Sequence, residues 1–500
     1  MPAIAIILLR IASARRRLPP PHSLPVRLEK LTMPRATTRS ELAALLQLAG
    51  PLIASQLAHM LMVLTDTLMM ARLSPEDLAG GGLGAASYSF VAIFCFGVIA
   101  AVGTLVANRH GANDAAGAAR LARAGLWLGW LLGAAGALLL WNLGPLLALL
   151  GQTPENVGHA EQFLRILPLA LPGAMTFMAL RGFTSAMGKA GPVMIISLLA
   201  AGLNALLNLA LIDGWFGLPR LGLAGIGLVT AIVANGMAVA LALYIGAAPA
   251  YRAFAILRGL GRPDWRSVGE LWRLGLPIGG TYAVEVGLFA FAALCIGTMG
   301  SAQLGAHQIA LQVVSVAFMV PVGLSYAVTL RVSRHHGAGE LHLARKAGRV
   351  GIGFGALVML GFSLLFWLAP KAIIGLFIDA NDPAFAAVFS LAVSLLAVAA
   401  WFELFDGVQT IAMGAIRGLK DSRLTFLIGL CCYWLIGAPI AWLLAFHAGW
   451  GPQGIWWGLA AGLGCAATTL CLGFEWRVSR LRRSGAAANT PATPPSVTVC

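Results

Sequence analysis

The chain has 500 residues, of which 59% are hydrophobic and 11% are charged, and its formal net charge is +15. Soluble domains carry about 25% charged residues, so this composition excludes an ordinary soluble protein and indicates a polytopic membrane protein. The basic residues gather at the ends of apolar segments, which argues against a nucleic-acid partner and for contact with membrane lipids. Seven cysteines without paired spacing predict neither a disulfide framework nor a metal site.

Both ends of the chain differ from its centre. Residues 1–40 form a basic segment that we expect to be disordered, and the sequence leaves open whether residues 1–32 are translated, because Met33 is an alternative start. The basic residues follow its short apolar run instead of preceding it, which argues against a signal peptide. Residues 478–500 are basic and then rich in proline, threonine and alanine, and we expect a disordered tail there too.

Between the two tails, apolar segments long enough to cross a bilayer follow one another regularly. The sequence predicts an all-α membrane protein with twelve transmembrane helices in two pseudo-symmetric six-helix bundles. The first bundle covers residues 41–247, the second covers residues 270–477, and residues 248–269 form a cytoplasmic linker between them. The predicted spans are 44–70, 80–107, 120–150, 161–186, 191–212, 222–247, 270–298, 304–331, 346–369, 385–416, 423–446 and 453–477.

The distribution of positive charge gives this arrangement an orientation. Of the 34 Lys and Arg residues, only Arg72, Arg165, Arg220 and Lys371 fall on the odd-numbered connections or the adjoining span ends. Positively charged residues collect on the cytoplasmic side of membrane proteins. The pattern therefore predicts that both termini are cytoplasmic, and we expect the chain to lie in a bacterial inner membrane.

The two halves of the chain also resemble each other. GPLIASQLAHM, which begins at Gly50, resembles GLPIGGTYAVE, which begins at Gly275, and Gly111 aligns with Gly337. The shift from Gly111 to Gly337 is 226 residues, the same as from Pro51 to Pro277. Because six helices separate the repeats, both halves have the same orientation, and a transport site between the bundles is expected near mid-membrane.

Four acids lie at membrane depth: Asp66 in the first span, Glu285 in the seventh, and Glu403 and Asp406 in the tenth. A charged residue at the bilayer centre costs roughly 2.5–3.5 kcal/mol on insertion scales, so such residues usually mark a functional site. No basic residue lies at similar depth in these spans, so the sequence offers no internal ion pair for them. We therefore interpret Glu285, Asp406 and Asp66 as a proton or cation site, with Glu403 as a candidate for a supporting role.

Amide side chains are candidates for supporting roles. Asn204 and Asn208 are four residues apart in the fifth span and share a helix face, and Gln308 begins a polar stripe in the eighth span. Each is as well explained by hydrogen bonding between helices as by a place in the site. The motifs of phosphate-binding loops and metalloproteases are missing from the sequence, which argues against an enzyme.

The sequence resembles the multidrug and toxic compound extrusion (MATE) transporters, and among them the NorM-like branch. The resemblance covers residues 41–475 and rests on LTDTLMMARL, RGFTSAMGKAGPVM, GLPIGGTYAVEVGLFAFAAL, LGAHQIALQVVSVAFMVPVGLSYAVTLRVSRHHGAG and GAIRGLKDSR. It implies antiport of cationic, amphipathic compounds such as drugs or dyes against H⁺ or Na⁺, by alternating access, without a cofactor. A lipid-linked or polysaccharide flippase of the same superfamily is the alternative. We expect the transporter to be a monomer.

The resemblance also implies roles for individual residues. The family's cation-site acids map onto Glu285 and Asp406, its functional first-span acid onto Asp66, and its amino-lobe polar pair onto Asn204 and Asn208. Phe402 stands where a tyrosine is common, and Glu403 stands where a neutral polar residue is common. These two departures favour a proton over Na⁺ as the coupling ion. The only metal ion implied is Na⁺, at Glu285 and Asp406.

Overall fold

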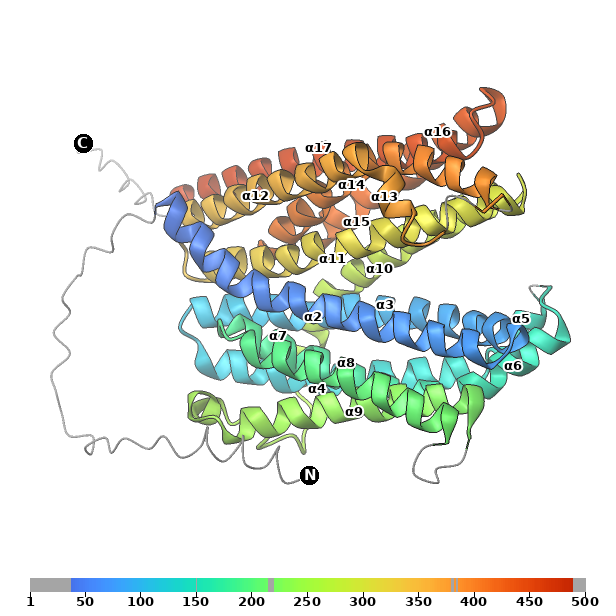
Figure 1. Ribbon diagram of the computed structural model, residues 1–500. Coiled ribbons are helices and arrows are strands. Elements are labelled where there is room, and N and C mark those ends of the chain that lie inside the picture. The colour runs from blue at the N-terminus through green and yellow to red at the C-terminus, as the bar shows by residue number, and fades with distance from the viewer. Residues whose placement is uncertain (1–36, 150, 215–219, 379–381, 384, 489–500) are drawn as a thin grey trace, which may run out of the picture. The chain divides into compact units, whose positions relative to one another are not determined.

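The computed structural model describes residues 37–149, 151–214, 220–378, 382–383 and 385–488. Residues 38–488 belong to one compact unit, and within the described residues every regular element is a helix. Twelve helices or helix groups are long and apolar enough to cross a membrane. The prediction of an all-α membrane protein with twelve spans is confirmed (Figure 1).

The first half of the chain supplies six spans. Their helices are α2 (Thr38–Leu73), α3 (Pro75–Gly111), α4 (Ala115–Trp141), α5 (Gly144–Leu149), α6 (Pro154–Ile166), η1 (Leu167–Leu169), α7 (Ala170–Ala186), α8 (Gly191–Asp213) and α9 (Gly222–Ala247). The predicted third span, 120–150, ends early at Trp141, and α5 is separate because Gly144 and Pro145 interrupt the helix. The fourth span begins earlier than predicted, at Pro154, and passes through a 3₁₀ turn at Pro168.

The second half supplies the other six spans. Its elements are η3 (Pro249–Phe254), α10 (Trp265–Gly297), α11 (Ser301–Gly337), α12 (Leu341–Leu368), α13 (Pro370–Ile374), α14 (Ala386–Gly418), α15 (Ser422–Leu430), η4 (Cys431–Gly437), α16 (Ala438–Trp442), η5 (Leu443–His447) and α17 (Gly451–Ala488). The elements η4 and η5 are π-helical stretches inside the eleventh span. π-Helical turns are rare and often occur at functional sites.

Two expected boundaries need correction, and part of each tail lies outside the described residues. Helix α17 continues to Ala488, so residues 478–488 of the expected carboxy-terminal tail are helical. Helix α10 already begins at Trp265, inside the expected linker. The expectation for residues 1–36 and for residues 489–500 lies outside the part of the chain that the structure describes.

Several helices begin at capping residues that the sequence supplies. The Ser74 side chain accepts a hydrogen bond from the Asp77 amide at 3.0 Å, and the Asp114 carboxylate accepts one from the Gly117 amide at 2.7 Å. Asp264 caps α10, and the hydroxyl of Ser267 donates to it at 2.6 Å, which holds the pKa of Asp264 below its usual value. These caps fix the first turns of α3, α4 and α10.

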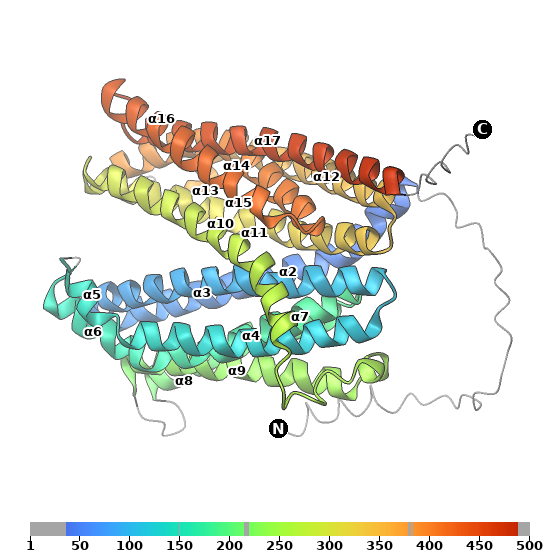
Figure 2. The same cartoon turned by 180° about the vertical axis from the view of Figure 1, so that it is seen from behind.

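One end of the helices carries the connections 112–114, 187–190, 338–340 and 419–421, and we call it the basic end. There, α3 of the first half packs closely on α11 of the second (Figures 1 and 2). A Cβ atom added at Gly111 would clash with the carbonyl of Arg334, and one added at Gly337 would clash with the carbonyl of Asn108. The two clashes are related by the 226-residue shift of the repeat, so the contact is pseudo-symmetric.

Polar contacts join the halves at the same end. The hydroxyl of Ser333 donates to the carbonyl of Thr104 at 2.7 Å, and the Asn108 side-chain amide donates to the carbonyl of Ser333 at 3.2 Å. Arg331 of α11 donates two hydrogen bonds to the buried carboxylate of Glu41 in α2, one of them at 2.9 Å. All of these residues lie in the parts of α2, α3 and α11 nearest the basic end. The two halves are therefore held together there.

Candidate functional site

The first group of interest surrounds Asp66 in α2. Its Oδ1 atom accepts hydrogen bonds from the Nδ2 atoms of Asn204 at 3.1 Å and Asn208 at 2.7 Å, both on α8. Its Oδ2 atom accepts a hydrogen bond from the hydroxyl of Thr230 on α9, at 2.9 Å. Two helices of the first half, α8 and α9, thus direct three donors at one carboxylate of α2.

The local sequence explains why these side chains meet. Asn204 and Asn208 are one helical turn apart, so both face the same neighbour, and both are buried. Hydrogen bonds to an ionised group are stronger than those between neutral groups, so this arrangement suits a carboxylate. The Oδ1 atom of Asn208 has no hydrogen-bond partner among the described residues. The group therefore offers oxygen atoms that a proton or a small hard cation could use.

The second group lies in the second half and contains the other three deep acids. Asp406 and Glu403 of α14 are 2% and 0% exposed, and Glu285 of α10 is partly buried. Asp406 lies close enough to interact electrostatically with Glu285, and Glu403 interacts in the same way with Asp406. Helices α10 and α14, far apart in the sequence, thus bring Glu285 within electrostatic range of Asp406, which in turn interacts with Glu403.

Neutral polar side chains hold Asp406 in place. The Gln409 side-chain amide donates to Oδ1 of Asp406 at 3.3 Å, and the hydroxyl of Tyr433 donates to Oε1 of Gln409. Gln409 and Tyr433 are both fully buried, and Tyr433 belongs to the π-helical stretch η4. The chain of contacts Tyr433–Gln409–Asp406 therefore ties the eleventh span to the acid group.

Glu403 differs from the other acids because neither of its carboxyl oxygens has a hydrogen-bond partner among the described residues. Burying a carboxyl group without such partners is unfavourable, and a bound proton or cation would relieve the cost. The position before it, Phe402, is fully buried against Phe289 and Trp456, with ring centroids 6.0 and 5.4 Å away. Because Phe402 is a phenylalanine, its buried ring offers no hydroxyl group beside Glu403.

The expectation that no basic side chain lies near these acids is wrong at Arg417. This residue closes α14, is only 6% exposed, and interacts electrostatically with Glu285. Its guanidinium donates to the hydroxyl of Tyr282 at 3.0 Å and lies over the Tyr282 ring, 4.9 Å from the ring centroid. The predicted tenth span ended at residue 416, which placed Arg417 in a connection.

Arg181 has the corresponding position in the first half. It is 7% exposed, donates to the side-chain oxygen of Gln56 at 2.8 Å, and lies 4.8 Å from the ring centroid of Tyr326 in the second half. Gln56 and Tyr282 are related by the 226-residue shift of the repeat. Each half therefore has a buried arginine that donates a hydrogen bond to the helix containing the repeat's first proline, α2 in the first half and α10 in the second. Arg181 also contacts the other half.

The structure brings most of the predicted site residues into two groups. Asp66, Asn204 and Asn208 form the first, and Glu285, Glu403 and Asp406 form the second, whereas Gln308 is exposed. Sequence reasoning missed Thr230, Gln409, Tyr433 and Arg417. Gln409 follows Asp406 by three residues, so helix spacing could have found it. The described residues contain no group of three or more His, Cys, Asp and Glu side chains placed to hold a metal ion.

The fold is that of a membrane protein with twelve helices or helix groups long and apolar enough to cross a bilayer. The family model MatE matches residues 51–210 and 277–443, one segment in each half. The chain belongs to the MATE family, in its NorM-like branch, and is a transporter and not an enzyme.

Curated relatives match nearly the whole chain. It is 71% identical over 442 residues to a probable multidrug resistance protein NorM of Pseudomonas putida. The aligned region covers 88% of this chain and 96% of the relative. It is 40% identical over 436 residues to the multidrug resistance protein NorM of Burkholderia vietnamiensis, covering 87% of this chain and 94% of the relative.

Solved structures share the fold. A crystal structure of the eukaryotic MATE transporter AtDTX14 matches with a TM-score of 0.80 at 22% identity, covering 89% of this chain and 99% of that one. A crystal structure of MATE in complex with MaL6 matches with a TM-score of 0.81 at 19% identity, covering 89% and 97%. At these identities the likeness extends to the fold alone.

Proposed function

We propose that the chain is a multidrug efflux antiporter that exports cationic, amphipathic compounds in exchange for H⁺ or Na⁺. The observation that carries this proposal is the group of three deep carboxyl groups, Glu285, Glu403 and Asp406, gathered from two helices of the second half. Carboxyl groups attract protons, small hard cations and positively charged cargo alike. The names of the relatives, multidrug resistance protein NorM, support drugs as the cargo.

In this account Glu285 and Asp406 bind the coupling ion, and Glu403 and Gln409 support them. Coupling requires that the ion and the cargo oppose each other's binding, through shared charge or through the conformations that each favours. An ion that neutralises Glu285 and Asp406 removes the charge that attracts a cationic cargo, and its release restores that charge. Arg417 limits the net negative charge of the group, so that loss of a bound ion leaves fewer uncompensated charges.

Asp66 acts in the first half as a separate contributor. Its three donors come from Asn204, Asn208 and Thr230, on α8 and α9. A change in the ionisation of Asp66 would alter all three hydrogen bonds at once and so change the packing of α2 against α8 and α9. This links ion binding to the helix arrangement of the first half.

The orientation follows from charge. We propose that the basic end faces the cytoplasm of a bacterial cell, with the chain in the inner membrane and both termini inside. The close contacts of Gly111 and Gly337 at that end support an arrangement that is closed toward the cytoplasm. Alternating access then requires these contacts to separate. Both bundles belong to one chain, so a single copy suffices, and no cofactor is needed.

Uptake of ethidium into inverted membrane vesicles tests this function. Vesicles with an imposed outward gradient of H⁺ or of Na⁺ are compared with vesicles that have neither gradient. One of the two gradients is expected to drive dye accumulation, and collapse of that gradient is expected to abolish it. Equal accumulation with and without either gradient, at the same protein level, would exclude antiport.

A further inference from the structure

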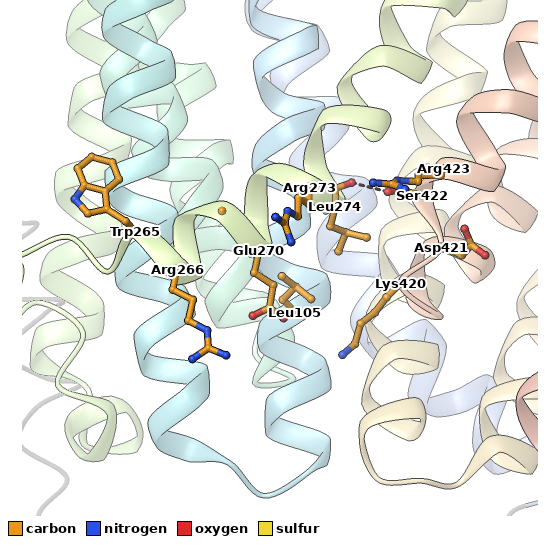
Figure 3. Close-up of a pocket in the computed structure, with 11 residues that line it drawn as sticks. Leu105, Trp265, Arg266, Glu270, Arg273, Leu274, Lys420, Asp421, Ser422 and Arg423 are labelled. Atoms are coloured by element: carbon orange, nitrogen blue, oxygen red, sulfur yellow. Dashed lines mark hydrogen bonds between the residues drawn. The ribbon is translucent and has the colours of Figure 1, made fainter. Parts of the chain in front are cut away.

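A cavity of about 600 Å³ lies at the basic end (Figure 3), and no residue of either acid group lines it. It is formed by the first turns of α10, the turn between α14 and α15, and Leu105 of α3. Four basic residues line it: Arg266 and Arg273 from α10, and Lys420 and Arg423 from the α14–α15 region. A hollow with four cationic side chains around it is suited to an anion.

The acids in the lining are already paired with other basic residues. Glu270 lies 3.7 Å from Arg109, and Asp421 lies 3.0 Å from Arg477, and neither arginine lines the cavity. Among the described residues, the four lining cations have no ion pair within 4.0 Å. The lining therefore carries four basic and two acidic side chains, which is an excess of positive charge, and Glu270 also interacts electrostatically with Lys420.

Arginine side chains suit phosphate oxygens in particular, because the planar guanidinium can donate two parallel hydrogen bonds to them. Basic pockets between transmembrane helices on the cytoplasmic side are a known setting for phospholipid headgroups. The lining residues lie at the start of the seventh span, where a headgroup would be in reach if the basic end faces the cytoplasm.

A stripe of exposed apolar side chains leads away from the cavity along α10. Trp265, which lines the cavity, is 62% exposed, Trp272 is 39% exposed, and Leu276 is 40% exposed. Their spacings of seven and four residues place them on one face of the helix. Tryptophan is enriched where membrane meets water. A soluble anion would make no contact with this apolar stripe, whereas the acyl chains of a lipid could lie along it.

We propose that this cavity binds the phosphodiester headgroup of an anionic phospholipid, with the acyl chains along Trp265, Trp272 and Leu276. The lining residues come from α3 in the first half and from α10 and the α14–α15 turn in the second. A bound headgroup therefore joins α10 to the α14–α15 turn, and it meets the first half only at Leu105 of α3. The site is independent of the exported cargo and of the acids that bind the coupling ion.

Thermal unfolding of the purified full-length transporter tests the site. The protein in neutral detergent is titrated with palmitoyl-oleoyl phosphatidylglycerol, with the corresponding phosphatidylcholine, or with inorganic phosphate. Phosphatidylglycerol is expected to raise the unfolding temperature in a saturable manner, and the other two are expected to leave it unchanged. In R273Q/R423Q, the phosphatidylglycerol concentration for half of the effect should rise about 30-fold, since each basic residue near a membrane surface contributes roughly fivefold to sixfold.

The matched control is R482Q/R483Q, which removes two exposed positive charges from the end of α17, outside the cavity, and should respond like the unsubstituted protein. If R273Q/R423Q does not fold, R266Q/K420Q repeats the test at two exposed positions of the lining. An unchanged phosphatidylglycerol response in the cavity variants would overturn the proposal. An equal, competing response to inorganic phosphate would overturn the assignment to a lipid and indicate a soluble anion.

Discussion

At the scale of single residues, the two acid groups differ in how their carboxylates are held. Asp66 has three donors from α8 and α9, whereas both oxygens of Glu403 lack partners among the described residues. Removing the charge from Asp66 should therefore disturb several helices, and removing it from Glu403 should disturb few.

For Asp66 we predict that D66N lowers dye export at least tenfold. An asparagine amide can replace only one of the two carboxylate oxygens, so at least one of Asn204, Asn208 and Thr230 loses its acceptor. The measurement is ethidium efflux from cells, normalised to the amount of protein in the membrane. The control is T67A, the next residue on α2, which is exposed and should export at the normal rate. Normal export by D66N would contradict a role for Asp66.

For Tyr433 we predict that Y433F destabilises the protein by about 1–3 kcal/mol, because the buried Oε1 atom of Gln409 loses its donor. Export should fall as well, since Gln409 then no longer holds its amide toward Asp406. Thermal unfolding and dye efflux measure the two effects. The matched variant Y244F, in the first half, should leave export unchanged. A Y433F protein with normal stability and export would show that the hydrogen bond has no part in the site.

The sequence identified the acids themselves, because a charge inside an apolar segment is visible without a structure. It could not identify their partners. Thr230 and Tyr433 are unremarkable in their own segments, and their roles arise only when α9 packs beside α2 and when the Tyr433 hydroxyl of η4 reaches Gln409 of α14. Arg417 was missed because the end of its helix was placed at residue 416, two residues too early.

At the scale of helices, the apolar composition of the segments was enough to predict most of the spans. Twelve spans follow from apolar length, and their starts follow from caps such as Ser74 and Asp264. The interruptions within spans were harder to predict. Gly144 and Pro145 separate α5 from α4 because proline interrupts a helix. The π-helical turns η4 and η5 pack against α17, a contact that local sequence does not encode.

For the contact between α3 and α11 we predict that G337A destabilises the protein by about 1–3 kcal/mol, as expected for overpacking. The added methyl group would clash with the backbone carbonyl of Asn108, and a backbone cannot move aside as a flexible side chain can. Thermal unfolding measures the effect. The matched control is G353A in α12, where an added Cβ meets nothing within 4 Å. Equal unfolding temperatures for the two variants would contradict the close contact.

At the scale of the whole molecule, the repeat predicted two halves that are alike in fold and unlike in chemistry. The shift of 226 residues relates the glycine contacts at the basic end and the partners of Arg181 and Arg417. It does not relate the acids, because Glu285 corresponds to His59 in the first half. Ion coupling is therefore expected to centre on the second half, and separation of the halves at the basic end is expected to be the step that it controls.

The most direct test of this central claim is ethidium export by E285Q/D406N, measured in inverted vesicles with the gradient that drives the unsubstituted protein. Both changes keep the size of the side chain and remove its charge. Gradient-driven export is expected to fall to the level of vesicles without the transporter, while the amount of folded protein in the membrane stays the same. Export at the unsubstituted rate would contradict it.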